Sequence, residues 1–335
     1  MKTVSIVIPC RNEAGYITAC LDSIIASDYP KNYLSVYVCD GLSTDGTKEK
    51  IEEYAAQFPF IHLIVNEKQT TPYALNLGIR ADNSDVAIIL GAHSTIEPDF
   101  ITNNCKALFS DESVGCAGGT LVNSYDNDLS RAIGYAMSQP FGVGNAYFRT
   151  GTKAGYVDTV AFGSYKREVF EKIGYFDEQL TRNQDDEFNF RVKKSGFKIL
   201  LDPSIRSHYV VRSSFGRLLR QYFQYGYWKV FVNQKYKMIT TIRQLVPFLF
   251  VAFLVAGAVA SIFSSLCRWL YGMILLAYLL LAFYFAATSK LSIKHWVSII
   301  LSFLILHIGY GCGYWVGIWD FLILKKNPAY DKLSR

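Results

Sequence analysis

The chain has 335 residues, of which 51% are hydrophobic, and 34 basic against 28 acidic side chains give it a formal net charge of +6. The excess is concentrated near the end, because residues 241–335 hold 8 of the basic and 2 of the acidic side chains, which leaves 26 of each before them. A general nucleic-acid binder would spread basic charge over its folded domain, so no nucleic-acid partner is expected. The composition also excludes a disordered chain and a disulfide scaffold, and the seven scattered cysteines predict reduced thiols.

Short apolar runs alternate with helical patterns along the first part of the chain. Strands are predicted at residues 4–9, 34–39, 62–65 and 86–90, and helices at 13–26, 44–58, 72–81 and 98–109. This alternation predicts an α/β fold with a mostly parallel, doubly wound sheet. Asn12 is the predicted cap of the first helix, and Thr71 before Pro72 is the predicted cap of the third.

Polar residues collect where the predicted strands end. These ends read Pro9 to Glu13, Asp40 to Gly46 and Gly91 to His93. Because a doubly wound sheet binds its ligands beyond the carboxyl ends of its strands, we expect the site at this edge.

A later helix is predicted to begin at Gln184. Acidic residues 185–187 occupy its first turn, lysines 193–194 its last, and Gly196 follows. This distribution complements the helix dipole and therefore has an explanation that needs no ligand.

Residues 206–243 form a basic and aromatic segment. Leu218, Tyr222 and Tyr225 follow the helical spacing i, i+4, i+7, so one face of a helix is apolar. Basic and aromatic side chains just before an apolar stretch predict an interfacial helix that lies on anionic lipid.

Three long apolar segments follow, between residues 244 and 322. Leu245–Cys267 and Trp269–Ser289 contain 23 and 21 residues without a charge, and each exceeds the ~20 residues that cross a bilayer. Trp296–Trp319 is interrupted only by His307, and it is rich in glycine. The basic residues around these segments leave the third one open, because a third span would put the basic tail at 323–335 outside. Either a span or a re-entrant or interfacial helix fits.

No signal-peptide pattern precedes the first strand. We therefore expect the domain of residues 1–205 to lie in the cytoplasm, anchored at the cell membrane by the multi-pass C-terminal part.

Several motifs stand in an order that resembles a known family. PCRNE follows the first strand, CDGLSTDGT the second, ALNLGI lies on the third helix, and VDTVAFGSYKREVFEKIGYFDEQLTRNQDDEFNFRV comes later. Together they resemble family 2 of the inverting, nucleotide-sugar-dependent glycosyltransferases, over roughly residues 1–240. FGVGNAYFR and QYFQYGYWK are similar to its membrane-anchored, succinoglycan-type exopolysaccharide subgroup. The resemblance implies a GT-A fold with a Rossmann-like nucleotide-binding half.

The resemblance also implies a set of donor-binding residues. Asp40 would accept a hydrogen bond from the uracil imide N–H. Glu13 and Asp45 would contact the nucleoside, although the helix dipole and capping explain both without a ligand. Arg212 would pair with the diphosphate, since a guanidinium matches phosphate geometry. The remaining donor-binding residues implied are Pro9, Arg11, Asn76 and Gly91.

The expected metal site departs from the family. Relatives usually have Asp-x-Asp after the fourth strand, whereas this chain has Gly91-Ala92-His93. His93 is the expected ligand of a divalent metal, Mn²⁺ or Mg²⁺, and imidazole suits Mn²⁺ better. A neutral, hydrogen-bonding histidine is the alternative. His208 is a second candidate ligand, with a purely structural histidine as its alternative.

The resemblance picks Asp185 as the general base that takes the proton of the acceptor hydroxyl. Asp186 and Glu187 are expected to raise its pKa by like charge. The expected function is transfer of a sugar from a UDP-sugar donor to a polyprenyl-linked acceptor, with membrane lipid and other polysaccharide-assembly proteins as further partners. Two alternatives stay open, direct transfer to polyprenyl phosphate and a non-catalytic nucleotide-sugar-binding subunit.

Overall fold

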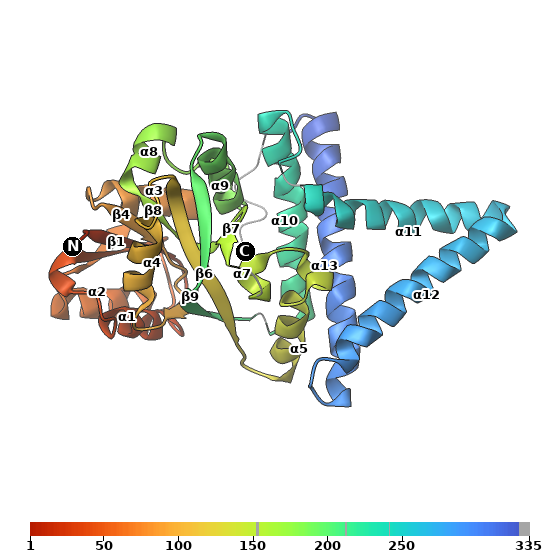
Figure 1. Cartoon of the computed structure of the whole chain (residues 1–335), viewed down its shortest axis with the longest axis horizontal. Coiled ribbons are helices and arrows are strands. Elements are labelled where there is room, and N and C mark those ends of the chain that lie inside the picture. Colours follow the sequence, from red (N-terminus) through yellow and green to blue (C-terminus); the bar gives the residue numbers. More distant parts are fainter. Residues whose placement is uncertain (152–153, 212, 241, 328–335) are drawn as a thin grey trace. The chain divides into compact units, whose positions relative to one another are not determined.

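The computed structural model describes residues 1–151, 154–211, 213–240 and 242–327 (Figure 1). The chain divides into two compact units. Of the described residues, the sheet unit contains 1–124 and 147–210, and the helical unit contains 125–146 and 211–327. Both units are therefore discontinuous in sequence.

The sheet unit is built on a nine-stranded sheet in the order β3-β2-β1-β4-β8-β6-β9-β5, with β7 paired to β9. The strands are β1 (Val4–Cys10), β2 (Leu34–Asp40), β3 (Ile61–Val65), β4 (Val86–Ile89), β5 (Ser94–Ile96), β6 (Val114–Ser124), β7 (Gly155–Tyr156), β8 (Ala161–Lys166) and β9 (Lys198–Val210). The first four strands are parallel, with Val4 opposite both Leu34 and Val86. β8 then pairs antiparallel with β4 and β6, so the sheet as a whole is mixed.

Helices cover both faces of this sheet. They are α1 (Ile17–Ile25), α2 (Thr47–Gln57), α3 (Thr71–Arg80), α4 (Phe100–Leu108), α7 (Tyr147–Thr150), α8 (Arg167–Ile173) and α9 (Gln184–Lys194), with the 3₁₀ turn η1 (Lys31–Tyr33). Alternate residues of β1 enter different cores, because Ile6 and Ile8 pack with α1 and α4 whereas Val7 packs with α3 and α9. The predicted α/β architecture is confirmed, and the sheet is parallel among its first four strands and again between β6 and β9.

Two of the predicted helix caps are wrong. Asn12 has a left-handed backbone, with φ of 53°, and α1 begins only at Ile17 with Tyr16 as its cap. Glu13 therefore lies in the loop before α1. The cap of α3 is Thr70, one residue earlier than predicted, and its side chain makes no capping hydrogen bond.

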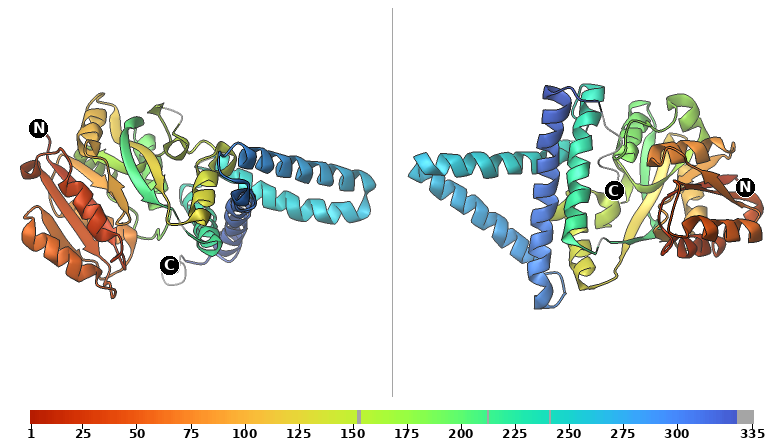
Figure 2. Two further views of the ribbon diagram at one scale, coloured as in Figure 1. Left: turned by 90° about the horizontal axis from the view of Figure 1, so that it is seen from below. Right: turned by 180° about the vertical axis from the view of Figure 1, so that it is seen from behind.

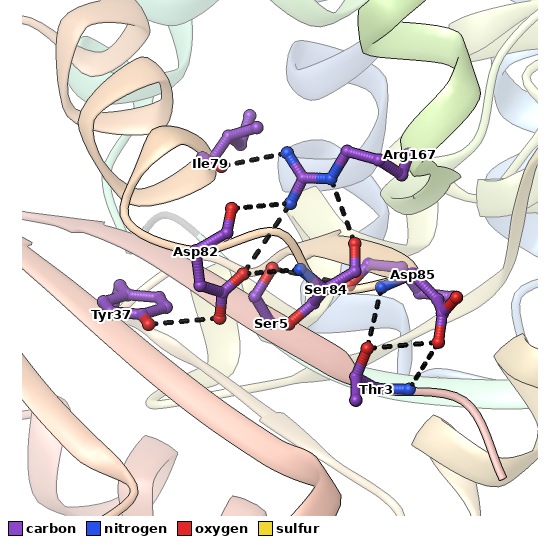
Figure 3. A network of polar contacts seen from close by, with 9 residues as sticks. Thr3, Ser5, Tyr37, Ile79, Asp82, Ser84, Asp85 and Arg167 are labelled. Atoms are coloured by element: carbon purple, nitrogen blue, oxygen red, sulfur yellow. Dashed lines mark hydrogen bonds and ion pairs between the residues drawn. The ribbon is translucent and has the colours of Figure 1, made fainter.

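A network around Arg167 stabilises the amino ends of the strands, opposite the expected ligand edge (Figure 3). Arg167 donates from Nε to the Ser84 carbonyl at 3.0 Å, from Nη1 to that of Ile79 at 3.1 Å, and from Nη2 to that of Asp82 at 3.0 Å. The Asp82 carboxylate also accepts a hydrogen bond from the Tyr37 hydroxyl. One side chain at the start of α8 thus fixes the turn between α3 and β4.

The helical unit contains nine helical segments within its described residues. These are α5 (Asp128–Met137), α6 (Pro140–Val143), α10 (Phe215–Tyr236), η2 (Ile242–Leu245), α11 (Val246–Phe263), α12 (Ser265–Ala287), η3 (Ile293–His295), α13 (Trp296–Gly317) and the π-helical turn η4 (Ile318–Ile323). α10 and α13 lie side by side, and α11 and α12 project away from them as a hairpin (Figures 1 and 2).

Glycines let α10 and α13 approach closely. A Cβ atom on Gly313 would lie 2.0 Å from the Phe223 carbonyl oxygen, and one on Gly226 would lie 2.0 Å from that of Tyr310. No larger residue fits either position without moving a helix backbone. One side of α10 is consequently covered, with Trp228 fully buried.

Three helices are long and apolar enough to cross a membrane, and they differ in how much protein covers them. The candidate spans are Ile242–Phe263, Ser265–Ala287 and Ile293–Ile323, of which 0%, 11% and 44% respectively are buried inside the protein. His307, the polar residue in the third, donates from Nε2 to the Phe141 carbonyl and accepts at Nδ1 from the Tyr278 hydroxyl. Its polar atoms are therefore satisfied within the helical unit.

We predict that Arg167→Ala lowers the free energy of unfolding by about 2–4 kcal/mol, because it leaves three backbone carbonyls without their charged donor. The thermal unfolding midpoint of the detergent-purified chain should fall by about 5–10 °C. Arg206→Ala, which removes an exposed arginine of β9, is the matched control and should change the midpoint little. An equal midpoint in the two variants would contradict the role of Arg167.

Candidate donor and acceptor site

The loops after β1 and β2 are joined by hydrogen bonds around Asp40, whose side chain is buried at the end of β2. Both carboxylate oxygens of Asp40 accept hydrogen bonds from Ser43, one from its backbone N–H at 3.0 Å and one from its hydroxyl. The Ser43 hydroxyl in turn accepts from the Asn12 N–H at 2.8 Å, and Asn12 Oδ1 accepts from the Thr44 N–H at 2.9 Å. The left-handed Asn12 thus fixes one loop against the other.

Asp45 also joins these two loops. It accepts hydrogen bonds from the N–H groups of Ala14 and Thr47, at 3.2 and 3.1 Å, and from the Thr47 hydroxyl. Burial alone would raise the pKa of Asp45, but the hydrogen bonds from Thr47 and Ala14 outweigh it and lower the pKa. These bonds account for Asp45 structurally, and its contact with a donor stays a prediction.

Glu13 and His93 come together at the edge of β1 and β4. Glu13 Oε1 lies 3.6 Å from His93 Nδ1, and their side chains are 15% and 25% exposed. Burial, followed by the charge of Glu13, raises the pKa of the neighbouring Cys20 thiol to about 12, so that thiol stays protonated and inert. The His93 ring meets the Tyr209 ring edge-on, with 5.5 Å between centroids.

Position 91, the first residue of the Gly91-Ala92-His93 segment, is closely packed. A Cβ atom on Gly91 would lie 3.2 Å from Cε1 of Phe162 and 3.4 Å from Oγ of Ser94. Phe162 itself has a left-handed backbone, with φ of 47°, which is rare for a bulky residue. A side chain at position 91 would therefore require the aromatic ring to shift by a few tenths of an ångström.

His208, the second predicted metal ligand, is paired with a carboxylate that the sequence analysis did not single out. Its Nε2 lies 2.7 Å from Oε1 of Glu97, just after β5. The described part of the chain contains no group of three or more His, Cys, Asp or Glu side chains arranged to hold a metal ion. The structure instead offers pairs, of which Glu13 and His93 supply one oxygen and one nitrogen ligand. Such a pair fits a divalent cation that takes its other ligands from substrate phosphates and water.

Arg149 of α7 and His93 both contact the ring of Tyr209. The guanidinium of Arg149 is 5.5 Å from the centroid of this ring. The buried Nη1 atom of Arg149 has no hydrogen-bond partner among the described residues. A buried donor without a partner costs free energy, so Arg149 is a candidate anion-binding residue.

Asp185, the predicted base, is exposed in the first turn of α9. Glu187 points the other way, is fully buried, and forms a bidentate ion pair with Arg191 at 2.8 and 2.9 Å. Arg191 thus compensates the charge of Glu187, and the predicted tuning of the pKa of Asp185 stays a prediction. Burial and the charges of Cys116 and Asp185 raise the pKa of Tyr165, so its hydroxyl is a neutral neighbour of the base.

The remaining predicted donor-binding residues are distributed as follows. Pro9 lies near the end of β1, opposite Cys39 of β2, and Arg11 follows β1 and lies beside Gly41. Asn76 is buried in α3, where it donates to Glu178 Oε1 and exchanges two hydrogen bonds with the backbone of Phe176. These bonds argue against direct contact with a donor. Arg212 lies outside the described residues.

Sequence reasoning missed Glu97, Phe162 and the pairing role of Arg191. Only Arg191 carried a signal, since it stands four residues after Glu187 on one helix. Glu97 and Phe162 meet their partners across the sheet, and a single sequence does not show such pairings.

Comparison with known proteins gives consistent results. The model of the family described as Glycosyl transferase family 2 matches residues 5–174. A dolichyl N-acetyl-alpha-D-glucosaminyl phosphate 3-beta-D-2,3-diacetamido-2,3-dideoxy-beta-D-glucuronosyltransferase of Methanococcus voltae is 36% identical over 68% of this chain and 72% of its own. The succinoglycan biosynthesis protein ExoA of Rhizobium meliloti is 27% identical over 94% of this chain and 95% of its own.

Among solved structures, the mannosyltransferase PcManGT of Pyrobaculum calidifontis, in complex with GDP-Man and Mn²⁺, superposes with a TM-score of 0.62. That likeness covers 95% of this chain and 88% of the other at 20% identity, and it shows that the fold is that of the GT-A glycosyltransferases. The family match spans half of the chain, and the relative from Methanococcus voltae exceeds 30% identity. The chain belongs to glycosyl transferase family 2.

Proposed function

We propose that this glycosyltransferase moves a sugar from a UDP-sugar to a saccharide linked to a polyprenyl lipid, at the cytoplasmic face of the membrane. The observation that carries the proposal is the convergence of the buried Asp40 and the Glu13–His93 pair at the carboxyl edge of β1, β2 and β4.

The nucleobase is recognised by Asp40. Its carboxylate accepts hydrogen bonds and donates none when ionised, so it suits a base that presents an imide N–H. Uracil and guanine present such a group, whereas cytosine has an acceptor at the corresponding ring nitrogen. The proposal names UDP and makes GDP the competing donor nucleotide.

The diphosphate lies near His93 and Glu13. These two side chains would hold a divalent cation, which would supply charge stabilisation to the leaving group. Arg149 adds a positive charge that no described carboxylate neutralises, and guanidinium geometry suits phosphate oxygens. A fixed positive charge of this kind would supply part of the charge stabilisation that a cation held by an Asp-x-Asp motif would otherwise give.

Asp185 is the proposed general base. Its carboxylate takes the proton from the acceptor hydroxyl while the hydroxyl oxygen forms a bond to the anomeric carbon. The bond from that carbon to the phosphate oxygen breaks, and the nucleotide diphosphate leaves with the electron pair. A single displacement of this kind inverts the anomeric centre. Exposure of Asp185 in the first turn of α9 leaves it open to an acceptor.

The lipid-linked acceptor is inferred from relatives. The relative from Methanococcus voltae is named for action on a dolichyl phosphate-linked sugar, and ExoA is named for succinoglycan biosynthesis. Both names support an acceptor sugar already attached to lipid. Direct transfer to polyprenyl phosphate would instead give a product with a single phosphate between lipid and sugar.

We propose that α11 and α12 are the membrane spans and that α13 lies with α10 at the membrane surface. α11 and α12 are apolar all round and almost uncovered, so only lipid can shield them, whereas protein covers nearly half of the α13 segment. α13 also runs beside α10 rather than along the hairpin (Figure 2). Two spans return the tail to the side of the sheet unit, in agreement with the positive-inside rule.

A calorimetric titration tests the donor. Detergent-purified protein should bind UDP more tightly than GDP and should not bind CMP, and Mn²⁺ should strengthen binding relative to chelator. Asp40→Asn should weaken UDP binding by about tenfold or more, because it replaces a charged acceptor with a neutral amide. His93→Ala should remove the metal dependence and leave metal-free binding unchanged. Equal UDP binding with and without metal in the wild type would eliminate the proposed cation.

A substitution at Asp185 tests the base. Asp185→Asn should reduce sugar transfer about 10²–10⁴-fold, because no group takes the hydroxyl proton, while UDP binding stays intact. Transfer is measured as radiolabel from UDP-sugars in the lipid extract of membranes that contain the protein. Asp186→Asn, in the adjacent position, is the control and should retain most of the activity. Turnover that survives in Asp185→Asn would remove this residue from the mechanism.

Labelling with a membrane-impermeant maleimide tests the number of spans. Cys267, at the tip of the hairpin, should react in intact cells, and Cys267→Ser should abolish this signal. In the Cys267→Ser background, Lys326→Cys should react only after the cells are permeabilised. Labelling of Lys326→Cys in intact cells would mean that α13 crosses the membrane.

A further inference from the structure

The helical unit has a groove between α10 and α13 that no step of the proposed reaction uses. It has a volume of about 480 Å³, within the range of ligand pockets. α10 lines it with Gly216, Leu219, Arg220 and Phe223, and α13 lines it with Ile308, Gly309 and Cys312. Apart from one arginine, the lining is therefore apolar.

Glycines keep this groove open. An added Cβ on Gly216 would meet no atom within 4 Å, so the space beside it is empty. On the facing helix, a Cβ on Gly309 would lie 3.1 Å from Cδ1 of Leu219. Leu219 is 44% exposed, although it stands between two packed helices. The groove thus presents apolar surface that the protein itself leaves uncovered.

Arg220 supplies the only charge among the lining residues. Its side chain is exposed, and no carboxylate of the described chain lies within ion-pair distance of it. An apolar trough with one unpaired cation complements an amphiphile that carries one anionic group on a hydrocarbon chain. The groove offers one trough and therefore accommodates one hydrocarbon chain. A diacyl phospholipid carries two chains and fits it less well.

We propose that the groove binds the isoprenoid chain of the lipid-linked acceptor and that Arg220 contacts the phosphate next to that chain. This inference rests on the proposed function, because it assigns a site to the acceptor's lipid part. The groove then acts as a specificity site, which selects a polyprenyl phosphate over bulk membrane lipid.

The test measures binding of decaprenyl phosphate to the full chain in detergent by native mass spectrometry. The wild type should retain decaprenyl phosphate in preference to dioleoylphosphatidylglycerol. Gly216→Leu should weaken retention about tenfold or more by filling the trough, and it should not disturb folding because its new side chain enters empty space. Arg220→Gln should weaken the retention of decaprenyl phosphate about tenfold. It should leave the retention of decaprenol, which lacks the phosphate, unchanged.

Two matched controls accompany these variants. Gly272→Leu introduces the same side chain on α12, at a glycine that also has no atom within 4 Å of an added Cβ, and it should bind like the wild type. Arg217→Gln removes an exposed arginine of the same helix that does not line the groove, and it should bind like the wild type too.

Two results would overturn the proposal. One is wild-type retention of decaprenyl phosphate by Gly216→Leu. The other is that the wild type retains phosphatidylglycerol as well as it retains decaprenyl phosphate, and that Gly216→Leu weakens the retention of both lipids to the same degree. The groove would then be a general lipid site. UDP titration of the same variants separates this outcome from a failure of the proposed function. If the wild type does not bind UDP, the donor proposal fails, and the lipid measurement can still be interpreted by itself.

Discussion

The site depends on the hydrogen bonds that join the loops after β1 and β2. Parallel strands bring these loops to one edge, but polar loop backbone is flexible unless its donors and acceptors are paired. Asn12, Ser43 and Asp45 supply that pairing, and they hold Asp40 and Glu13 at fixed positions. The loops that recognise the donor are therefore already ordered. The conformational entropy of ordering them is lost during folding and not on binding.

The sequence predicted the parts of the fold that local patterns determine. Apolar periodicity gave the first four strands within one or two residues of their observed ends, because a strand buried on both faces leaves a strong signal. The mixed half of the sheet was not predicted, since β8 and β9 pair with strands that are distant in sequence. Asn12 shows the limit of cap signatures, because its side chain serves a neighbouring loop and not its own helix.

The same distinction holds for the candidate site. Motif resemblance brought Asp40, His93 and Asp185 forward, but it did not indicate that Arg191 neutralises Glu187 or that Glu97 pairs with His208. The first contact joins two side chains on one face of α9, and the second joins side chains from different elements. In the helical unit, the glycine-rich third apolar segment carried no packing prediction, and its close approach to α10 emerged only from the structure.

The contact between Gly91 and Phe162 couples these two positions. A side chain added at position 91 would place its Cβ atom 3.2 Å from Cε1 of Phe162, so the ring would have to shift by a few tenths of an ångström, and the backbone of Phe162 is itself left-handed. Residues in contact do not contribute additively to stability, so the effect of a substitution at position 91 depends on which residue occupies position 162.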